Sequence, residues 1–197
     1  MNCNDSPAAD APPVAAKPAA ASRSIFLVGL MGAGKTTIGR LLSRHRNMEF
    51  VDSDYEIVAR CGVSIPTIFE IEGEAGFRKR ESAMIDELTQ RPGIVLATGG
   101  GAVLDPVNRA HLKSRGIVVY LHCSPQELYL RTRHDRNRPL LQTEDPLARL
   151  EALYVQRHPL YLEVADIVVD SGKQSTHCLV RRLEQELERV GAAADQA

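Results

Sequence analysis

The sequence predicts an α/β fold in which helices cover both faces of a parallel sheet. Five short segments suit strands, and four of them are nearly continuous apolar runs, as expected for strands buried on both faces. Between these segments the apolar spacing becomes helical, so strands and helices alternate along the chain. The 197 residues contain no internal repeat and suffice for one domain with a substantial core.

The elements are predicted in order from apolar spacing and from capping signals. Asp105-Pro106, Ser124-Pro125 and Asp145-Pro146 each place a capping residue before a proline suited to the first helical turn. Strands are expected at residues 25–28, 49–51, 94–97, 116–121 and 167–169. Helices are expected at residues 37–44, 55–60, 64–69, 74–88, 105–114, 124–133, 145–164 and 176–190.

The first predicted strand runs into a phosphate-binding motif. Residues 29–36 fit the pattern G-x-x-x-x-G-K-[ST], for which a chance match in a chain of this length has a probability of about 1%. Glycines let the backbone turn its N–H groups towards a phosphate, and the N-terminus of the following helix adds positive potential. Lys35 can reach the β- and γ-phosphates, and the hydroxyl of Thr36 can bind Mg²⁺. The motif therefore predicts nucleoside triphosphate binding.

Candidate ligand-binding segments follow two other strands, at the sheet edge where parallel α/β folds bind ligands. Asp52 and Asp54 follow the second strand and suit Mg²⁺ support and orientation or deprotonation of an attacking hydroxyl, although they could also cap a helix. No aspartate follows the third strand; Gly99 to Gly101 stand there instead. These glycines would allow a small ligand to approach the backbone, or they could form a simple turn.

Arginines from distant segments of the chain are further candidates for ligand binding. Arg78 and Arg157 could converge on a carboxylate because a guanidinium binds a carboxylate through two parallel hydrogen bonds, and Glu81 lies at i+3 to steady Arg78. For either arginine alone, a surface salt bridge is the simpler interpretation. Residues 131–141 hold four arginines, which form either a solvated basic face or a mobile lid that brings an arginine to the transferred phosphoryl group.

Composition limits the remaining possibilities. The net charge of −1 does not favour nucleic acid or an anionic membrane as a partner, and no apolar run is long enough to span a bilayer. The four scattered cysteines suit reduced thiols in a cytoplasm. Residues 1–23 are rich in Ala and Pro and are expected to be a disordered tail, followed by one domain at 24–192 with a lid at about 134–145 and a short tail at 193–197.

The ordered set of motifs resembles the shikimate kinase family over about residues 24–190. The motifs are Gly29 to Arg40, Asp52-Ser-Asp54, Phe77-Arg78-x-x-Glu81, Gly99 to Gly101, Arg138-Pro-Leu-Leu141 and Arg157-x-x-x-Tyr161. The resemblance implies a P-loop kinase sandwich of three layers, with a parallel sheet of order 2-3-1-4-5 and a short lid. It also implies a cytosolic monomer that uses ATP, with one Mg²⁺ per subunit, to phosphorylate the 3-hydroxyl of shikimate.

The resemblance also implies a role for each matching residue. Asp54, Lys35 and Arg138 would be catalytic, with Arg138 as the lid arginine. Asp54, Arg78, Gly100 and Arg157 would bind shikimate, and Thr36 and Asp52 would support Mg²⁺. The ATP site would consist of Gly32, Ala33, Gly34, Lys35, Thr36, Thr37, Arg131, Arg138 and Gln174, with Arg131 and Gln174 near the adenine.

Two other functions stay open on the sequence. A gluconate or nucleoside monophosphate kinase would carry a similar phosphate loop, although the paired arginines and the short lid favour a small acid as acceptor. A non-catalytic nucleotide-binding module would share the fold, although Asp54, Arg138 and Lys35 are all present.

Overall fold

A computed structural model describes residues 23–135, 139–172 and 174–194. Five parallel strands form one sheet of order β2-β3-β1-β4-β5, as the family resemblance implies. The strands are β1 (Ile25–Val28), β2 (Glu49–Asp52), β3 (Ile94–Ala97), β4 (Ile117–His122) and β5 (Ile167–Asp170). They match the five predicted strands to within one residue at each end.

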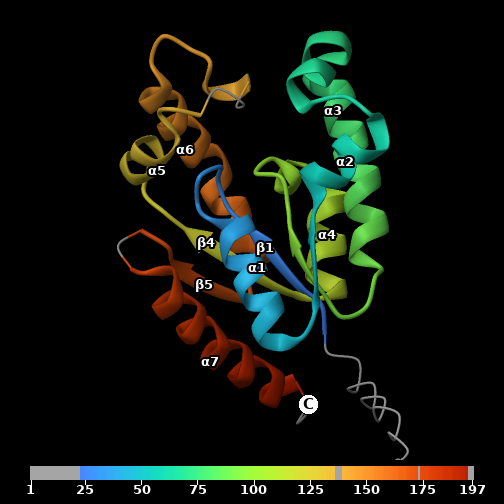
Figure 1. Cartoon of the computed structure of the whole chain (residues 1–197), viewed down its shortest axis with the longest axis vertical. Coiled ribbons are helices and arrows are strands. Elements are labelled where there is room, and N and C mark those ends of the chain that lie inside the picture. The colour runs from blue at the N-terminus through green and yellow to red at the C-terminus, as the bar shows by residue number, and fades with distance from the viewer. Residues whose placement is uncertain (1–22, 136–138, 173, 195–197) are drawn as a thin grey trace, which may run out of the picture.

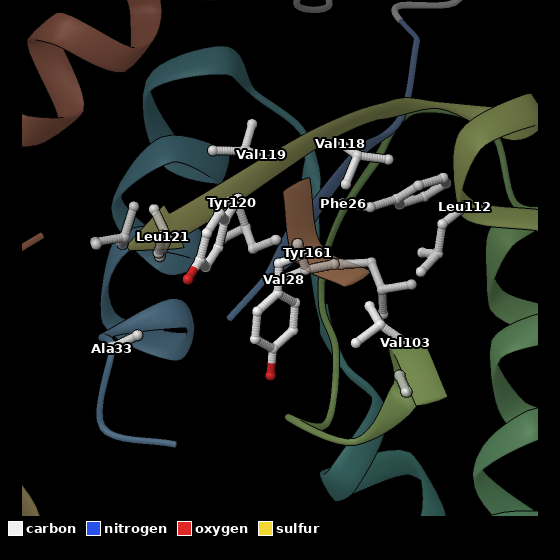
Figure 2. Packing of buried hydrophobic residues seen from close by; sticks show 14 of the residues in the cluster. Phe26, Val28, Ala33, Val103, Leu112, Val118, Val119, Tyr120, Leu121 and Tyr161 are labelled. Carbon is white, nitrogen blue, oxygen red and sulfur yellow. The ribbon is translucent and has the colours of Figure 1, made fainter. Parts of the chain in front are cut away.

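The burial of each strand follows its position in the sheet. The central strands β1, β3 and β4 are buried on both faces, which explains their uninterrupted apolar sequences. The edge strand β5 alternates between buried and exposed residues, and Val168 on its open face is 47% exposed. The apolar core therefore lies around the three central strands, where Phe26, Tyr120 and Tyr161 pack among aliphatic side chains (Figure 2).

Helices cover the sheet in two layers (Figure 1). Helices α1 and α7 pack together on one face, whereas α4 packs against both α3 and α6 on the other face. The helices are α1 (Lys35–Arg46), α2 (Ser53–Cys61), α3 (Ile65–Thr89), α4 (Pro106–Arg115), α5 (Pro125–Thr132), α6 (Pro146–Val164) and α7 (Thr176–Ala194), with short 3₁₀ turns at η1 (Ala102–Leu104) and η2 (Pro139–Leu141). No helix in these described ranges is long and apolar enough to cross a membrane.

The predicted helix starts form as their capping signals indicate. The side chains of Asp105, Ser124 and Asp145 accept hydrogen bonds from backbone N–H groups in the first turns of α4, α5 and α6. The two helices predicted at 64–69 and 74–88 are joined into α3, but Gly73 interrupts the helical backbone with φ 70° and ψ −179°. A left-handed φ favours glycine, so Gly73 marks the break that the sequence predicted.

The sheet register brings the ligand-binding loops to one edge. Asp52 at the end of β2 lies opposite Ala97 at the end of β3, and Val28 at the end of β1 lies opposite Tyr120 in β4. The loops that leave β1, β2 and β3 therefore emerge side by side. At this edge α2 and the first half of α3 stand on one side, and α5 and the start of α6 stand on the other (Figure 1).

Candidate active site

The phosphate loop joins β1 to α1 through a backbone that requires glycine. Gly32 has φ 81°, and Gly34, the N-cap of α1, has φ 95°. A Cβ at Gly32 would also lie 2.6 Å from the methyl group of Thr132 in α5. The loop thus fits tightly under α5, and its end leads directly into the N-terminus of a helix of 12 residues, which favours anions.

Lys35 turns back over this loop. Its Nζ donates to the carbonyls of Gly29 at 2.8 Å and Leu30 at 3.0 Å. Lys35 also lines a polar cavity together with Met31, Gly32, Gly34, Thr36, Thr37, Asp52, Asp54, Thr98, Gly100, Arg131, Thr132 and Asp135. This phosphate cavity contains a lysine ammonium and the start of a helix, which are the groups that bind a polyphosphate.

Thr36 and the first aspartate meet beside the loop. The Thr36 hydroxyl donates to Asp52 Oδ2 at 2.8 Å, and Asp52 Oδ1 accepts from the Asp54 backbone N–H at 3.1 Å. Asp52 is thus the N-cap of α2, as the alternative interpretation proposed, and it also lies in the phosphate cavity. Asp54 reaches the same cavity from the first turn of α2 rather than by continuing the strand geometry.

The donor chemistry around Thr36 and Asp52 fits Mg²⁺. A hydroxyl and a carboxylate are hard oxygen ligands, which Mg²⁺ prefers, and they lie at the loop that would hold the phosphates. The described ranges contain no group of three or more His, Cys, Asp or Glu side chains suited to a metal. A cation here would therefore depend on phosphate and water oxygens for most of its ligands, as Mg²⁺ commonly does.

A second pocket adjoins the phosphate cavity and is partly apolar. It is lined by Met31, Asp54, Ile65, Phe69, Phe77, Arg78, Glu81, Gly99, Gly100, Leu140 and Arg157. Met31, Asp54 and Gly100 line both spaces, so the two open towards each other at these residues. The acceptor pocket, as we call the second space, thus combines apolar walls with two arginines and two carboxylates.

Arg78 is held in place by carboxylates on its own helix. Its Nη1 lies 2.7 Å from Glu81 Oε2, and its Nη2 lies 2.8 Å from Glu74 Oε1. Although burial lowers the pKa of Arg78, the attraction of Glu81 and the hydrogen bonds to Glu74 and Glu81 outweigh burial and raise it. The predicted support of Arg78 by Glu81 is confirmed.

Glu81 itself is almost completely buried, with 1% of its surface exposed. Burial raises the pKa of this carboxyl, and the neighbouring Arg78 guanidinium opposes the rise. Its second oxygen, Oε1, is buried and has no hydrogen-bond partner among the described residues.

Arg157 is buried on the opposite wall with only 2% of its surface exposed, so it is not a surface ion-pairing residue. Its Nη1 donates to the carbonyl of Gly100 at 3.1 Å. No carboxylate in the described ranges forms an ion pair with it, its buried Nε lacks a hydrogen-bond partner there, and burial lowers its pKa. A buried guanidinium without an ion-pair partner among the described residues strongly attracts an anionic group in the pocket.

The run of three glycines makes room for these side chains. A Cβ at Gly99 would lie 2.3 Å from Glu81 Oε1, and a Cβ at Gly101 would lie 2.1 Å from Arg78 Nη1. Gly100 lines both cavities, and a Cβ added there would lie no closer than 3.4 Å to any neighbouring atom. The glycines were predicted to admit a ligand; the outer two instead admit Glu81 and Arg78.

The predicted base-binding residues border a third pocket. Arg131 and Gln174 line it with Gly32, Ala33, Gly34, Thr37, Ile38, Ser171, Thr176 and Leu179. The Arg131 guanidinium donates to the carbonyls of Ser171 at 2.6 Å and Gly172 at 2.7 Å, so it ties α5 to the turn after β5. Arg138, the predicted lid arginine, lies outside the described residues.

Several residues of the acceptor pocket were not predicted from the sequence. Met31, Ile65, Phe69 and Leu140 line its walls, and Tyr161 donates from behind it to the Gly100 carbonyl at 2.6 Å. Apolar side chains from three separate segments carry no local signal of a shared pocket. Only the spacing of Arg157 and Tyr161, four residues apart on one helix, indicated that these two side chains share a face.

The sheet order, the phosphate loop and the adjoining acceptor pocket together define a P-loop kinase of the class that phosphorylates small molecules. The family model described as shikimate kinase matches residues 31–188. The shikimate kinase of Cupriavidus pinatubonensis is 63% identical over 174 residues, which cover 88% of this chain and 91% of the relative. The chain therefore belongs to the shikimate kinase family.

Solved structures agree with this assignment. The shikimate kinase of Acinetobacter baumannii, determined in complex with shikimate, has a TM-score of 0.82 at 49% identity and covers 83% of this chain and 92% of its own. A gluconokinase from Sinorhizobium meliloti has a TM-score of 0.55 at 18% identity, covering 89% of this chain and 97% of its own. The second likeness supports the shared fold alone.

Proposed function

We propose that this chain transfers the γ-phosphoryl group of ATP to the 3-hydroxyl of shikimate. The observation that carries the proposal is the pair of arginines, the buried Arg157 and the partly buried Arg78, in a pocket that opens into the phosphate cavity at Asp54 and Gly100. Two guanidinium groups suit the carboxylate of a small hydroxy acid. The apolar walls at Phe69 and Phe77 suit the carbon ring of such an acceptor.

Asp54 is proposed as the residue that orients or deprotonates the attacking hydroxyl. It lines both cavities, so its carboxylate lies where an acceptor hydroxyl would meet the transferred phosphoryl group. Gly100 adds a backbone contact to the acceptor. These assignments give the acceptor pocket a charged group for each end of the substrate.

Lys35 and the loop Gly32 through Thr37 would bind the phosphates of ATP, and the helix start at Lys35 adds positive potential. Thr36 and Asp52 would support a single Mg²⁺, which supplies charge neutralisation at the phosphates when bound. Arg131 and Gln174 would lie against the adenine. Arg138 would act from the lid at about 134–145 on the transferred group.

The remaining assignments follow from the family and from composition. We propose a cytoplasmic monomer that acts on shikimate and ATP without a nucleic-acid or membrane partner. The domain would span 24–192, with short tails at 1–23 and 193–197.

An ADP-release assay with the purified full chain, ATP and Mg²⁺ tests both the acceptor and the role of Asp54. We expect ADP release to depend on shikimate and not on gluconate or a nucleoside monophosphate. The Asp54→Asn variant should lower kcat by about 10²- to 10⁴-fold, because general base or orienting groups contribute that much. Asp105→Asn is the matched control, since Asp105 caps α4 and lines neither cavity, and asparagine caps equally well.

The experiment tests the substrate and the role of Asp54 independently, because each has its own contradicting result. Absence of shikimate-dependent ADP release by the unmodified chain would contradict the proposed substrate. Near-normal kcat in Asp54→Asn, with shikimate turnover intact, would remove Asp54 from proton handling and leave the substrate assignment standing.

A further inference from the structure

The Gly100 carbonyl receives two hydrogen bonds from the same helix. Arg157 Nη1 donates to it at 3.1 Å and Tyr161 Oη at 2.6 Å. The two donors are four residues apart in α6, so they lie one turn apart on the same face. A carbonyl oxygen has two lone pairs, and these donors occupy both.

Tyr161 does not itself border the cavities. Its side chain is fully buried (0% exposed), and it is absent from the linings of both the acceptor pocket and the phosphate cavity. Its ring stacks on Tyr120 of β4, with ring centroids 4.9 Å apart, among the aliphatic side chains of the core (Figure 2). Packing against the sheet thus fixes the position of the phenol, and its hydrogen bond fixes the position of the Gly100 carbonyl.

The Gly100 backbone depends on hydrogen bonds from other residues to hold its position. It has no side chain to anchor it, its neighbours Gly99 and Gly101 have none either, and it lies where the two cavities meet. Three successive glycines have high conformational freedom, so an unsupported loop would lose more entropy on binding an acceptor. The same carbonyl also fixes Nη1 of Arg157, the buried guanidinium of the pocket.

We propose that Tyr161 is a positioning residue for acceptor binding, which acts by holding the Gly100 carbonyl and, through it, the Arg157 guanidinium. The inference rests on the proposed function for the identity of the acceptor and goes beyond it in assigning a role to a side chain that never touches the substrate. Loss of the hydroxyl leaves the carbonyl with one donor and frees both the glycine loop and Arg157 to move.

The structure offers a matched control in Tyr120. Both phenols are buried, and their rings stack on each other, but the Tyr120 hydroxyl bonds Nδ1 of His158 at 3.0 Å rather than a group at the pocket. Tyr161→Phe and Tyr120→Phe therefore each remove one buried hydroxyl from the same aromatic pair. Only Tyr161→Phe removes a bond to the acceptor pocket.

Steady-state kinetics of the full chain give the first test. We expect Tyr161→Phe to raise the KM for shikimate about three- to tenfold, the loss equivalent to one hydrogen bond, with kcat and the KM for ATP changed less than about twofold. Tyr120→Phe should leave all three constants within about twofold of the unmodified chain. An unchanged shikimate KM in Tyr161→Phe, or an equal rise in both variants, would overturn the proposal.

Amide hydrogen exchange of the substrate-free protein gives a second test that does not depend on the identity of the acceptor. Tyr161→Phe should speed exchange across residues 99–104, and Tyr120→Phe should not. Equal exchange in this segment for all three proteins would overturn the positioning role. Failure of the unmodified chain to turn over shikimate would count against the proposed function alone, because the exchange comparison would still decide the role of Tyr161.

Discussion

The phosphate cavity takes much of its lining from one continuous segment, Met31 to Thr37, whereas the acceptor pocket is assembled from α2, α3, the loop after β3, η2 and α6. In the first region the phosphate-binding groups are the loop backbone, the start of α1 and Lys35, which are adjacent in the sequence, so a local motif specifies them. In the second region the binding groups are charged side chains, of which Arg157 is buried and Arg78 and Asp54 are partly buried. Their positions depend on the packing of helices that are far apart in the sequence.

The two regions therefore differ in what a substitution would disturb. The phosphate loop holds charge at the reacting group, so damage there should affect the rate of the chemical step. The arginines of the acceptor pocket hold charge at the far end of the acceptor, so damage to them should affect binding. The predictions below test this separation.

Among the three substitutions that compare the two regions, the largest effect is expected at Lys35 in the phosphate cavity. Lys35→Ala should lower kcat by about 10²- to 10³-fold, because it removes a preorganised positive charge from the phosphates. The KM for shikimate should change far less. Steady-state kinetics against Lys113→Ala, a surface lysine that donates to the Glu163 carbonyl, provide the comparison.

A Lys35→Ala variant that lost shikimate affinity as strongly as kcat would show that the two regions act as one unit. The thermal stability of both variants should be measured alongside, since Lys35 also bonds two loop carbonyls.

The same contrast explains how far the sequence could predict the site. The phosphate loop was predicted from eight adjacent residues because a local backbone pattern suffices to form it. Arg78 and Arg157 were suspected from residue type, but their convergence on one pocket and the burial of Arg157 depend on helix packing that periodicity does not specify. The role of the outer glycines was not predicted, because the space they provide for Glu81 and Arg78 exists only after α3 docks on the β3 loop.

The fold was predicted more completely than the site. Strand positions and helix caps follow from local apolar spacing and from residues such as Asp105 and Ser124, whose capping bonds form within one turn. The sheet order came from the family resemblance. The number of apolar runs alone does not decide which strands are neighbours, because that order depends on long-range packing.

A smaller effect is expected at Arg78 in the acceptor pocket. Arg78→Ala should raise the KM for shikimate about 10- to 100-fold, since a charged hydrogen bond contributes about 1.5–3 kcal/mol, and should change kcat less. Arg80→Ala is the matched control on the same helix, because Arg80 pairs with Glu72 at an exposed position.

An unchanged shikimate KM in Arg78→Ala would contradict the carboxylate assignment. A change in the KM for ATP of the same size as that for shikimate would instead break the separation between the two regions.

The smallest effect, and the sharpest test of packing in the acceptor pocket, is expected at Gly101. Its φ of −100° and ψ of −5° are open to alanine, so any cost of Gly101→Ala arises from the new Cβ, which would lie 2.1 Å from Arg78 Nη1. The Arg78 guanidinium must shift to make room for this Cβ, and we expect the KM for shikimate to rise about threefold to tenfold while the fold is retained.

A double-mutant cycle isolates this mechanism. If the clash with Arg78 is the cause, Gly101→Ala should have no further effect on the shikimate KM in the Arg78→Ala background, because the neighbour that it displaces is gone. Gly191→Ala in α7 is the control: nothing lies within 4 Å of its new Cβ, so it should raise the free energy of unfolding by about 0.5–1 kcal/mol without changing either KM. Additive effects of the Gly101 and Arg78 substitutions would mean that the Gly101 backbone contacts the substrate itself. The acceptor pocket would then bind its ligand partly through backbone groups, as the phosphate loop does.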